Sequence, residues 1–390
     1  MTQLIVRPHD PMVFRDARSF SGESGNLART LPWPTPSVTA GFVRSALGRA
    51  AGGGLFHPDR RAALLGVEVH GPLLLDDGTV HLPAPRDLVV IRSQGESRVR
   101  PLLPLRPTPL ASGEGMTLPD PRLVPAMAHT PEKASPTPPF WSLDRMTEWL
   151  ADPERFSAPS TAPDPSSSAS GFRPELPTDE RTQVRIDPAS GRSAEGLLYT
   201  VRSVAFAPTQ AIVVRVRTRD PELSRLVTCL QGLHPLGGER RLAEVCVDGP
   251  ALGWQCPGSI RERLGISSTV RLVLATPAVF AGGWRPGWLT GSPPRGRVPG
   301  TEVEVELVAA VVDRWRPLSG WDLARNRAKR LRRMAPAGSV YFLRVLGGQS
   351  RQLAERWLEP VSDDPQDGCD GFGLALWGVW HEGNGKEASG

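Results

Sequence analysis

Glycine and proline interrupt this chain so often that a fold made of long helices is excluded. With 40 glycines and 41 prolines in 390 residues, the two types make up about a fifth of the sequence, against roughly one residue in eight in average proteins. Both destabilise helix interiors, glycine through its backbone entropy and proline through its missing N–H. A long-helix bundle and a coiled coil are therefore ruled out, and short strands, turns and irregular loops are favoured. The length allows about two domains.

The basic residues are almost all arginine. Lysine occurs only at Lys133, Lys329 and Lys386, so 43 of the 46 basic residues are arginines, and the formal net charge is +5. Arginine is suited to bidentate contact with phosphate and to stacking on bases. Codon usage in a GC-rich genome would explain the overall excess of arginine equally well. Only the clustering of the arginines can therefore indicate a function.

The sequence lacks the common signatures of disulfide, metal, nucleotide and membrane sites. Its four cysteines form no CxxC pair and have no zinc-ligand spacing, and no GxxxxGK(S/T), HExxH or GxSxG motif is present. The longest uncharged apolar stretch, Leu272–Trp284, contains Pro277 and is too short to span a bilayer. Thr2–Arg7 has the pattern of a strand rather than of a signal peptide. We therefore expect a cytoplasmic protein without cofactor, bound metal or membrane partner.

The first eighty residues follow a β–α–β–β order. Gln3–Arg7 alternates as a strand, and Ser37 is positioned to cap a helix with apolar residues at fourfold spacing. Leu73–Leu75 and Val80–Leu82 then flank Asp77-Gly78, which is typical of a tight hairpin turn. This order is the beginning of a ferredoxin-like unit.

Between about Pro107 and Pro177 the periodicity disappears. Within this region Pro159–Gly171 is of low complexity and has almost nothing apolar to bury, so we expect it to be mobile. A short helix near Trp141–Leu150 interrupts the region. We interpret the whole stretch as a Pro/Ser-rich irregular insertion or a domain junction.

Regular patterns return after residue 182 and again mix strands with short helices. The strand patterns include Gly196–Phe206, Ala211–Arg217, Leu242–Val247, Val270–Ala275, Val303–Val312 and Gly338–Leu346. Glu222–Leu230 and Gln352–Leu358 predict helices. The predicted fold class is α+β, with two tandem ferredoxin-like domains at residues 1–178 and 179–380 and a flexible tail at residues 381–390.

The densest basic cluster lies between residues 314 and 333. It contains one acidic residue, Asp322, and two aromatic ones, Trp315 and Trp321. Its basic residues are Arg314, Arg316, Arg325, Arg327, Lys329, Arg330, Arg332 and Arg333. Guanidinium groups beside aromatic rings suit single-stranded RNA, because they can hold its phosphates while the rings stack on exposed bases. An acidic protein partner, or a solvated helix face with two core tryptophans, would produce the same pattern.

Two glycine-bearing segments allow the backbone to approach a ligand closely. Gly237-Gly238-Glu239-Arg240-Arg241 lies between a predicted helix and a predicted strand, where successive N–H groups can cradle a phosphate. A tight turn explains these glycines equally well. Gly371-Phe372-Gly373 resembles half of a dinucleotide fingerprint, but it precedes a strand, whereas that fingerprint follows one. We interpret it instead as a loop that contacts an RNA backbone.

Several segments, taken in order, resemble one known family. The opening LIVRPHDPMVFRDARSFSGES…LARTLPWPTPSVTAGFVRSALG is similar to the start of the third subunit of Cmr complexes, the type III-B CRISPR effectors. HLPAPRDLV, GLLYTVRSV, LGGERR and PAGSVYFLRVL are similar to later parts of that subunit. The closing GFGLALWG resembles the glycine-rich loop of the RAMP superfamily. The order of the segments, more than any one of them, carries the resemblance, and residues 107–177 resemble nothing in the family.

The resemblance implies two ferredoxin-like (RAMP, RRM-like) folds and a role without catalysis. Such subunits cap the 5′ tag of the CRISPR RNA (crRNA), beside the backbone RAMP subunits, and dock the large palm-domain subunit. The resemblance implies that three sets of residues contact RNA. They are Arg15, Arg18 and Arg29 after the first strand, Gly237, Gly238, Arg240 and Arg241 in the turn at residues 237–241, and Gly371 and Gly373 (with Gly378) in the glycine-rich loop. Arg325, Arg327 and Arg330 are the candidates from the basic cluster.

Two alternatives remain open. Some RAMP relatives cleave precursor RNA with histidine or tyrosine acid–base pairs. Here His234 could take a 2′-hydroxyl proton while an arginine stabilises the phosphorane, which would make the protein a metal-independent endoribonuclease. The only tyrosines, Tyr199 and Tyr341, are both placed within predicted strands, which argues against that chemistry. The other alternative is a protein-only scaffold whose basic cluster meets an acidic partner.

Overall fold

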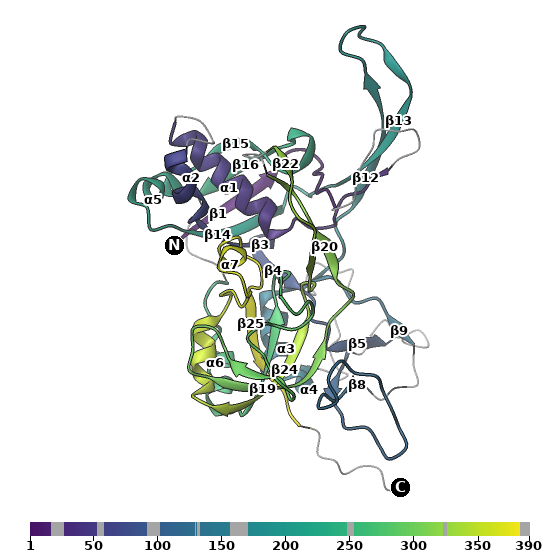
Figure 1. Ribbon diagram of the computed structural model, residues 1–390, viewed down its shortest axis with the longest axis vertical. Helices are drawn as coiled ribbons and strands as arrows, with labels where there is room; N and C mark the ends of the chain where they lie inside the picture. Colours follow the sequence, from purple (N-terminus) through teal and green to yellow (C-terminus); the bar gives the residue numbers. More distant parts are fainter. Residues whose placement is uncertain are drawn as a thin grey trace.

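Antiparallel sheet dominates the computed structural model (Figure 1). The structure describes residues 1–16, 27–52, 58–91, 102–128, 130, 133–156, 171–247, 253–322 and 326–382. Within these residues the longest helix is α1 (Pro36–Ala50), with 15 residues. None of the helices described has the length and apolar composition needed to cross a membrane. The expected absence of long helices is therefore confirmed for the part of the chain that the structure describes.

The first sheet has eight strands in the order β11-β10-β4-β3-β14-β1-β16-β15, all antiparallel. The strands are β1 (Thr2–Pro8), β3 (Glu68–Asp76), β4 (Thr79–Pro83), β10 (Phe140–Ser142), β11 (Phe172–Arg173), β14 (Gln210–Arg217), β15 (Gly232–Pro235) and β16 (Leu242–Val247). Leu4 of β1 lies opposite Val214 of β14 on one side and Val247 of β16 on the other. The amino-terminal strand is therefore in the interior of the sheet.

This sheet crosses the domain boundary expected at residue 178. β1, β3 and β4 precede that position, whereas β14, β15 and β16 follow it and belong to the same sheet. The expected insertion at residues 107–177 also contributes β10 and β11, which bury Trp141 and Phe172. A boundary at residue 178 therefore does not separate the sheets, because local periodicity carries no information on which distant strands pair. Residues 157–170 and 383–390, which include most of the low-complexity segment and of the expected tail, lie outside the described residues.

The second sheet has five antiparallel strands in the order β18-β19-β24-β17-β25. The strands are β17 (Thr269–Leu274), β18 (Arg295–Arg297), β19 (Glu304–Val311), β24 (Val340–Gly347) and β25 (Ala375–Val379). Three of them lie where alternation predicts strands, and β25 follows the glycine-rich loop as expected. The α+β class is thus confirmed in its coarse form, as a mixed fold of large antiparallel sheets with few helices.

The remaining elements lie outside the two sheets, and the longest of their strands, β13, pairs with β12 in a ribbon that projects away from the rest of the molecule (Figure 1). The helices are α2 (Pro58–Leu65), α3 (Leu143–Ala151), α4 (Pro153–Phe156), α5 (Pro221–Thr228), α6 (Gly258–Ile266), α7 (Pro365–Cys369) and the 3₁₀ helices η2 (Gly238–Arg240) and η3 (Ser350–Arg356). The strands are β2 (Leu27–Ala28), β5 (Leu88–Ile91), β6 (Leu102–Pro104), β7 (Arg106–Pro107), β8 (Ala126–Met127), β9 (Ala134–Ser135), β12 (Thr178–Ile186), β13 (Ser193–Val204), β20 (Arg316–Leu318), β21 (Trp321–Asp322), β22 (Arg327–Ala328) and β23 (Arg332–Met334).

The first sheet is buried on both faces. Along β14, Ile212 and Val214 belong to a hydrophobic cluster with α1 and α5, whereas Ala211 and Val213 belong to a second cluster that contains the second sheet. Successive side chains of a strand point to opposite faces, so this alternation places the helices above the first sheet and the second sheet below it. Each aliphatic side chain buried in this way stabilises the fold by about 1.5–3 kcal/mol.

Two local predictions concern turns. Asp77 and Gly78 join β3 to β4 with φ angles of +48° and +74°, so the predicted tight hairpin is confirmed. The predicted helix α1 is also confirmed, but Ser37 does not cap it. Thr35 occupies the N-cap position and Pro36 begins the helix, because proline needs no hydrogen-bond partner for its nitrogen there.

A buried ion pair joins residues 1–247, here called the first half of the molecule, to residues 253–382, here called the second half. The guanidinium of Arg271 in β17 pairs with the Asp87 carboxylate, and both side chains are at most 1% exposed. The same carboxylate accepts a 2.9 Å hydrogen bond from Nε1 of Trp149 in α3. The backbone carbonyl oxygen of Trp149 in turn accepts a hydrogen bond from the Arg271 guanidinium. Burial lowers the pKa of Arg271, and Asp87 partly offsets that effect. A charge buried in this way needs its counter-charge to remain in the folded state.

We predict that Asp87→Asn lowers the stability of the full chain by about 3–5 kcal/mol, because it leaves the Arg271 guanidinium buried without a counter-charge. Thermal unfolding followed by circular dichroism measures the effect. Asp179→Asn is the matched control, because its 2.7 Å pair with Arg181 is largely exposed and contributes at most about 1 kcal/mol. Equal melting temperatures for the two variants would contradict the prediction.

Candidate nucleic-acid interface

A groove of about 420 Å³ runs between helix α1 and the basic cluster. Ser37, Gly41 and Ser45 of α1 line one side at fourfold spacing, and Val13–Arg15 and Gly237-Gly238 also line it. On the opposite side lie residues 317–321 and 329, 330 and 332 of the basic cluster. The groove therefore brings together three of the segments singled out in the sequence: the loop after β1, the glycine turn and the basic cluster.

The basic cluster folds as a hairpin and not as a helix face. Residues 314–334, here called the basic hairpin, contain two ladders, β20 with β23 and β21 with β22. Leu318 and Met334 bury one side of the hairpin against Phe372, and Arg332 pairs with Asp367 at 2.7 Å. Burial raises the pKa of the Asp367 carboxyl, and Arg332 partly offsets that effect. These contacts attach a hairpin that belongs to the second half to the rest of the molecule.

Most of the cations that the structure describes in the basic hairpin have no carboxylate partner. Among the described residues no ion pair forms with Arg314, Arg316, Arg327, Lys329 or Arg330. Trp315 and Trp321 are 46% and 54% exposed, so they are not core residues, and Trp321 lines the groove. Unpaired cations next to an exposed indole can bind a polyanion that also carries flat rings. Arg325, one of the predicted RNA contacts, lies outside the described residues.

The glycine turn closes on the loop after β1. Gly238 N donates a 2.7 Å hydrogen bond to the Val13 carbonyl. Gly237 has φ +71°, and a Cβ atom there would lie 2.6 Å from the same oxygen. Arg241 pairs with Glu239 at 2.9 Å, whereas Arg240 is exposed and has φ +53°. Gly237 is therefore required by this close approach, and Arg240 is the cation that the turn presents to solvent.

The predicted arginines after β1 have different surroundings. Arg15 is exposed, lines the groove and forms a β-bridge with Thr30. Arg29 is exposed but is not among the residues that line the groove. Arg18 lies outside the described residues. Of the three, Arg15 is the one that the fold places beside the glycine turn and the basic hairpin.

The glycine-rich loop is an internal contact and not a surface. Gly371 and Gly373 are buried, with φ angles of +91° and +70°. A Cβ atom on Gly371 would lie 2.4 Å from the Val69 carbonyl oxygen of β3, and one on Gly373 would lie 2.6 Å from Ser362 Oγ. The expectation that these two glycines contact RNA is therefore corrected, because the backbone of Gly371 is enclosed against β3 of the first sheet and that of Gly373 against Ser362. Gly378 is likewise buried against Leu150.

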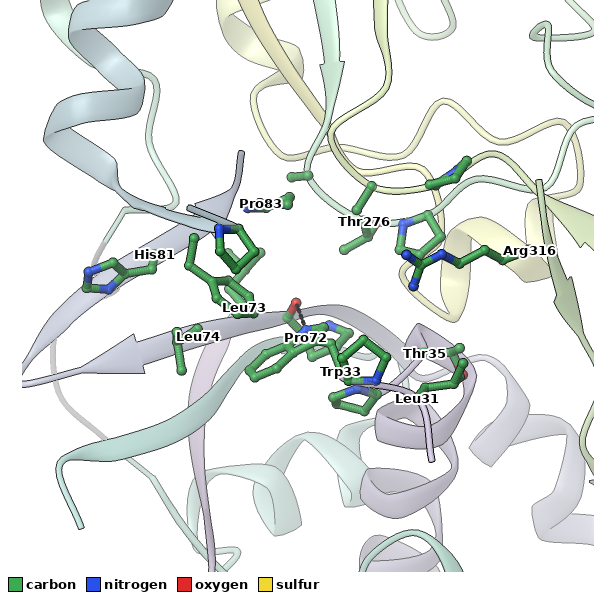
Figure 2. Close-up of a pocket in the computed structure, with 18 of the residues that line it drawn as sticks. Leu31, Trp33, Thr35, Pro72, Leu73, Leu74, His81, Pro83, Thr276 and Arg316 are labelled. Atoms are coloured by element: carbon green, nitrogen blue, oxygen red, sulfur yellow. Dashed lines mark hydrogen bonds between the residues drawn. The ribbon is translucent and has the colours of Figure 1, made fainter. Parts of the chain in front are cut away.

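A smaller cleft of about 170 Å³ lies between the two halves (Figure 2). Trp33 and Pro72 line it from the first half, and Thr276 lines it from the second. Trp33 donates a 3.4 Å hydrogen bond from Nε1 to the Pro72 carbonyl, and Arg316 of the basic hairpin extends toward the space between Thr276 and Pro72 (Figure 2). The groove and the cleft share Leu31 and Thr35 as lining residues.

Sequence reasoning did not select Trp33 or the small residues of α1 that line the groove. Fourfold spacing of Ser37, Gly41 and Ser45 is visible in the sequence. The sequence does not show that this helix face is open, because its openness depends on where the basic hairpin lies. Trp33 lies in the proline-rich LPWPTP segment, which belongs to the family resemblance. That segment was therefore the one available signal for the cleft.

His234 and Tyr341, the residues considered for RNA cleavage, contact other residues of the protein. His234 is half-buried, its ring centroid lies 6.2 Å from that of Phe42, and its Nδ1 lies 3.4 Å from Arg49 Nη2. Burial lowers the pKa of His234, and the positive charge of Arg49 lowers it further. Tyr341 is buried and donates a 2.5 Å hydrogen bond to the Trp284 carbonyl, and burial raises its pKa. Within the described residues no group of three His, Cys, Asp or Glu side chains is arranged to hold a metal ion.

Comparison with known proteins assigns the family. The model of the CRISPR-associated protein family Cas_Cmr3 matches residues 4–380. The chain belongs to the Cmr3 family. The resemblance to the third subunit of Cmr complexes is thereby confirmed, and the chain is a subunit of type III CRISPR effectors. No curated protein sequence matches the chain.

Three of the solved structures that contain a chain similar to this Cmr3-family chain are the following. A chain of the type III-B Cmr-beta complex bound to cognate target RNA and AMPPnP is 15% identical, with a TM-score of 0.47, and 87% of this chain and 86% of that chain are covered. A chain of the Csm3–Csm4 subcomplex of the type III-A interference complex is 9% identical, with a TM-score of 0.40 and coverage of 89% and 94%. A chain of the Csm1–Csm4 cassette in complex with pppApA is 12% identical, with a TM-score of 0.32 and coverage of 89% of both chains.

We predict that Gly371→Ala destabilises the chain by more than the roughly 1–3 kcal/mol expected from backbone strain alone, because its Cβ would overlap the Val69 carbonyl oxygen at 2.4 Å. Gly113→Ala is the matched control, since Gly113 has a similar φ of +90° and a Cβ there meets nothing within 4 Å. Thermal unfolding of both variants separates the overlap from the strain. A Gly371→Ala chain as stable as the Gly113→Ala chain would show that the loop is not closely packed.

Proposed function

We propose that this Cmr3-family protein is a non-catalytic RNA-binding subunit of a type III-B effector complex in antiviral defence. It holds the 5′ tag of the crRNA, docks the large palm-domain subunit and contacts a backbone RAMP subunit. The observation that carries this proposal is the convergence of Arg15, Gly237-Gly238, Trp321 and Arg330 on one groove, although they come from segments far apart in the sequence.

The residues of the groove have three proposed roles. Lys329 and Arg330 of the basic hairpin, together with Arg15, bind phosphates. Trp321 offers a ring on which an unpaired base can stack, which contributes about 1–3 kcal/mol per base. Gly41 and its small neighbours on α1 leave room for a sugar–phosphate chain close to the helix, since a Cβ on Gly41 would meet nothing within 4 Å. We also assign RNA contacts to Arg29, Arg240 and Arg327, which are exposed and do not line the groove.

The same geometry supports a subunit that holds RNA without cutting it. General acid–base cleavage needs two titratable groups within hydrogen-bond reach of one phosphate. His234 contacts Phe42 and Arg49 instead, and Tyr341 is enclosed in the core. We therefore favour binding over the metal-independent endoribonuclease alternative. We further propose that each of the two sheets, with its helices, forms one ferredoxin-like RAMP module.

We predict that Lys329→Ala with Arg330→Ala weakens the binding of a single-stranded RNA carrying the 5′ tag sequence by roughly ten-fold or more, equivalent to at least about 1.4 kcal/mol. The slope of log K against log salt should also become shallower by about 0.7 for each phosphate that the variant no longer neutralises. Fluorescence anisotropy over a salt series measures both quantities.

Arg351→Ala is the control for charge, because Arg351 is an exposed residue of η3 that lines neither cavity. Its affinity and salt slope should match those of the wild-type chain. An unchanged slope in the Lys329/Arg330 variant would remove these residues from the RNA interface. Loss of affinity in the Arg351 variant would mean that binding follows net charge and not the groove.

We also predict that Gly41→Leu weakens binding of the same RNA without loss of stability. Leucine has a higher helix propensity than glycine, and the open face of α1 leaves its side chain in the groove. Gly41→Ala is the control, since it stabilises the helix by about 0.5–1 kcal/mol while filling much less space. Equal RNA affinity for the leucine and alanine variants would show that the strand does not pass over this face of α1.

A further inference from the structure

The basic hairpin has a second, outer face that belongs to neither cavity. Trp315, Leu331 and Arg333, with the neighbouring Arg314, are here called the outer face. Trp315 is 46% exposed and Leu331 is 58% exposed, and both arginines are also exposed. None of these four residues lines the groove or the cleft. The outer face is thus a surface of its own, with two large apolar side chains and two cations.

Strand geometry separates this face from the groove. Arg332, the first residue of β23, lines the groove, whereas the next residue of the strand, Arg333, does not. Leu331, which precedes the strand, does not line the groove either. Successive side chains of an extended strand point in opposite directions. A ligand in the groove therefore reaches Arg332 from one side of β23 and leaves Arg333 uncovered on the other, and it does not cover the exposed Leu331.

The chemistry of the outer face differs from that of the groove. The Arg333 guanidinium lies over the Trp315 ring, 4.7 Å from its centroid, so one face of the indole is already covered by a cation. Leu331 has no group that can bind a phosphate or a base edge. Exposed tryptophan and arginine are, in contrast, the residues that most often dominate the binding energy of protein interfaces.

The charge of the outer face indicates the sign of its partner. In the part of the chain that the structure describes, neither Arg314 nor Arg333 forms an ion pair. Two unpaired cations that flank an apolar pair fit a protein surface with carboxylates around an apolar contact, because opposite potentials favour and orient association.

We propose that the outer face docks an acidic surface of another protein subunit of the effector complex, while the groove side of the same hairpin holds RNA. Trp315 and Leu331 form the apolar centre of this interface, and Arg314 and Arg333 pair with carboxylates at its edge. This inference deepens the proposed docking role and rests on it, but it does not depend on RNA binding in the groove.

The test uses the full chain in its assembled complex. Wild-type and Trp315→Ala/Arg333→Glu chains are co-expressed with the other protein subunits of the same complex and a guide RNA, then purified through a tag on this chain. Native mass spectrometry should show one protein subunit reduced at least about ten-fold in occupancy, which needs a loss of binding free energy of more than about 1.4 kcal/mol. Affinity of the isolated variant for the single-stranded RNA probe, measured by anisotropy, should stay unchanged.

The Lys329→Ala/Arg330→Ala chain is the matched control, and it should lose RNA affinity while retaining every protein subunit. This reversed pattern separates failure of the docking inference from failure of the RNA proposal. Full subunit occupancy in the Trp315/Arg333 variant would overturn the inference. So would a fall in RNA affinity, which would assign the outer face to RNA.

A cross-linking measurement covers the case in which the double variant assembles poorly for other reasons. A photoreactive amino acid is introduced in place of the exposed Leu331 in the assembled complex. Cross-links to a segment rich in Asp and Glu of another protein subunit would support the inference. Cross-links to RNA, or none to protein, would overturn it.

Discussion

The buried pair of Arg271 with Asp87 holds the second sheet against the first half of the molecule, and the candidate interface depends on that alignment. Further contacts tie the same junction together: Arg215 with Glu359 at 2.7 Å and Arg44 with Asp370 at 2.5 Å. One side of the groove belongs to α1 and the other to the basic hairpin of the second half. The width of the groove is therefore set by how the halves are packed, and not by either half alone.

Paired and unpaired cations have different places in this fold. Arginines at the junction of the halves have carboxylate partners and little exposure, since a buried charge without a counter-charge is strongly destabilising. The exposed cations of the basic hairpin, such as Arg316, Lys329 and Arg330, form no ion pairs within the described residues. The arginine-rich composition thus divides into a structural set and a set available to a partner, and the sequence alone does not distinguish them.

The glycines divide in a similar way. Gly371 and Gly237 are needed where a backbone approaches closer than a Cβ atom allows, so their conformations serve the junction and the turn. Gly41, in contrast, leaves space open on a helix face that lines the groove. A glycine in a functional region is therefore evidence of close approach, but the approaching group can be the protein's own chain, as it is at Gly371.

The sequence by itself determined the local elements: the alternation of β14 and β24, the apolar face of α1 and the turn at Asp77-Gly78 depend on neighbours in the chain. It also identified the family, through short segments in a fixed order, and the basic cluster with its tryptophans. The tertiary structure decided which strands pair, and so placed β14 to β16 in one sheet with β1 across the expected boundary at residue 178. It also enclosed Gly371 and Gly373 and opened the groove beside Gly41. These features arise from contacts between residues far apart in the chain, whose free energy leaves no trace in the periodicity of any one segment.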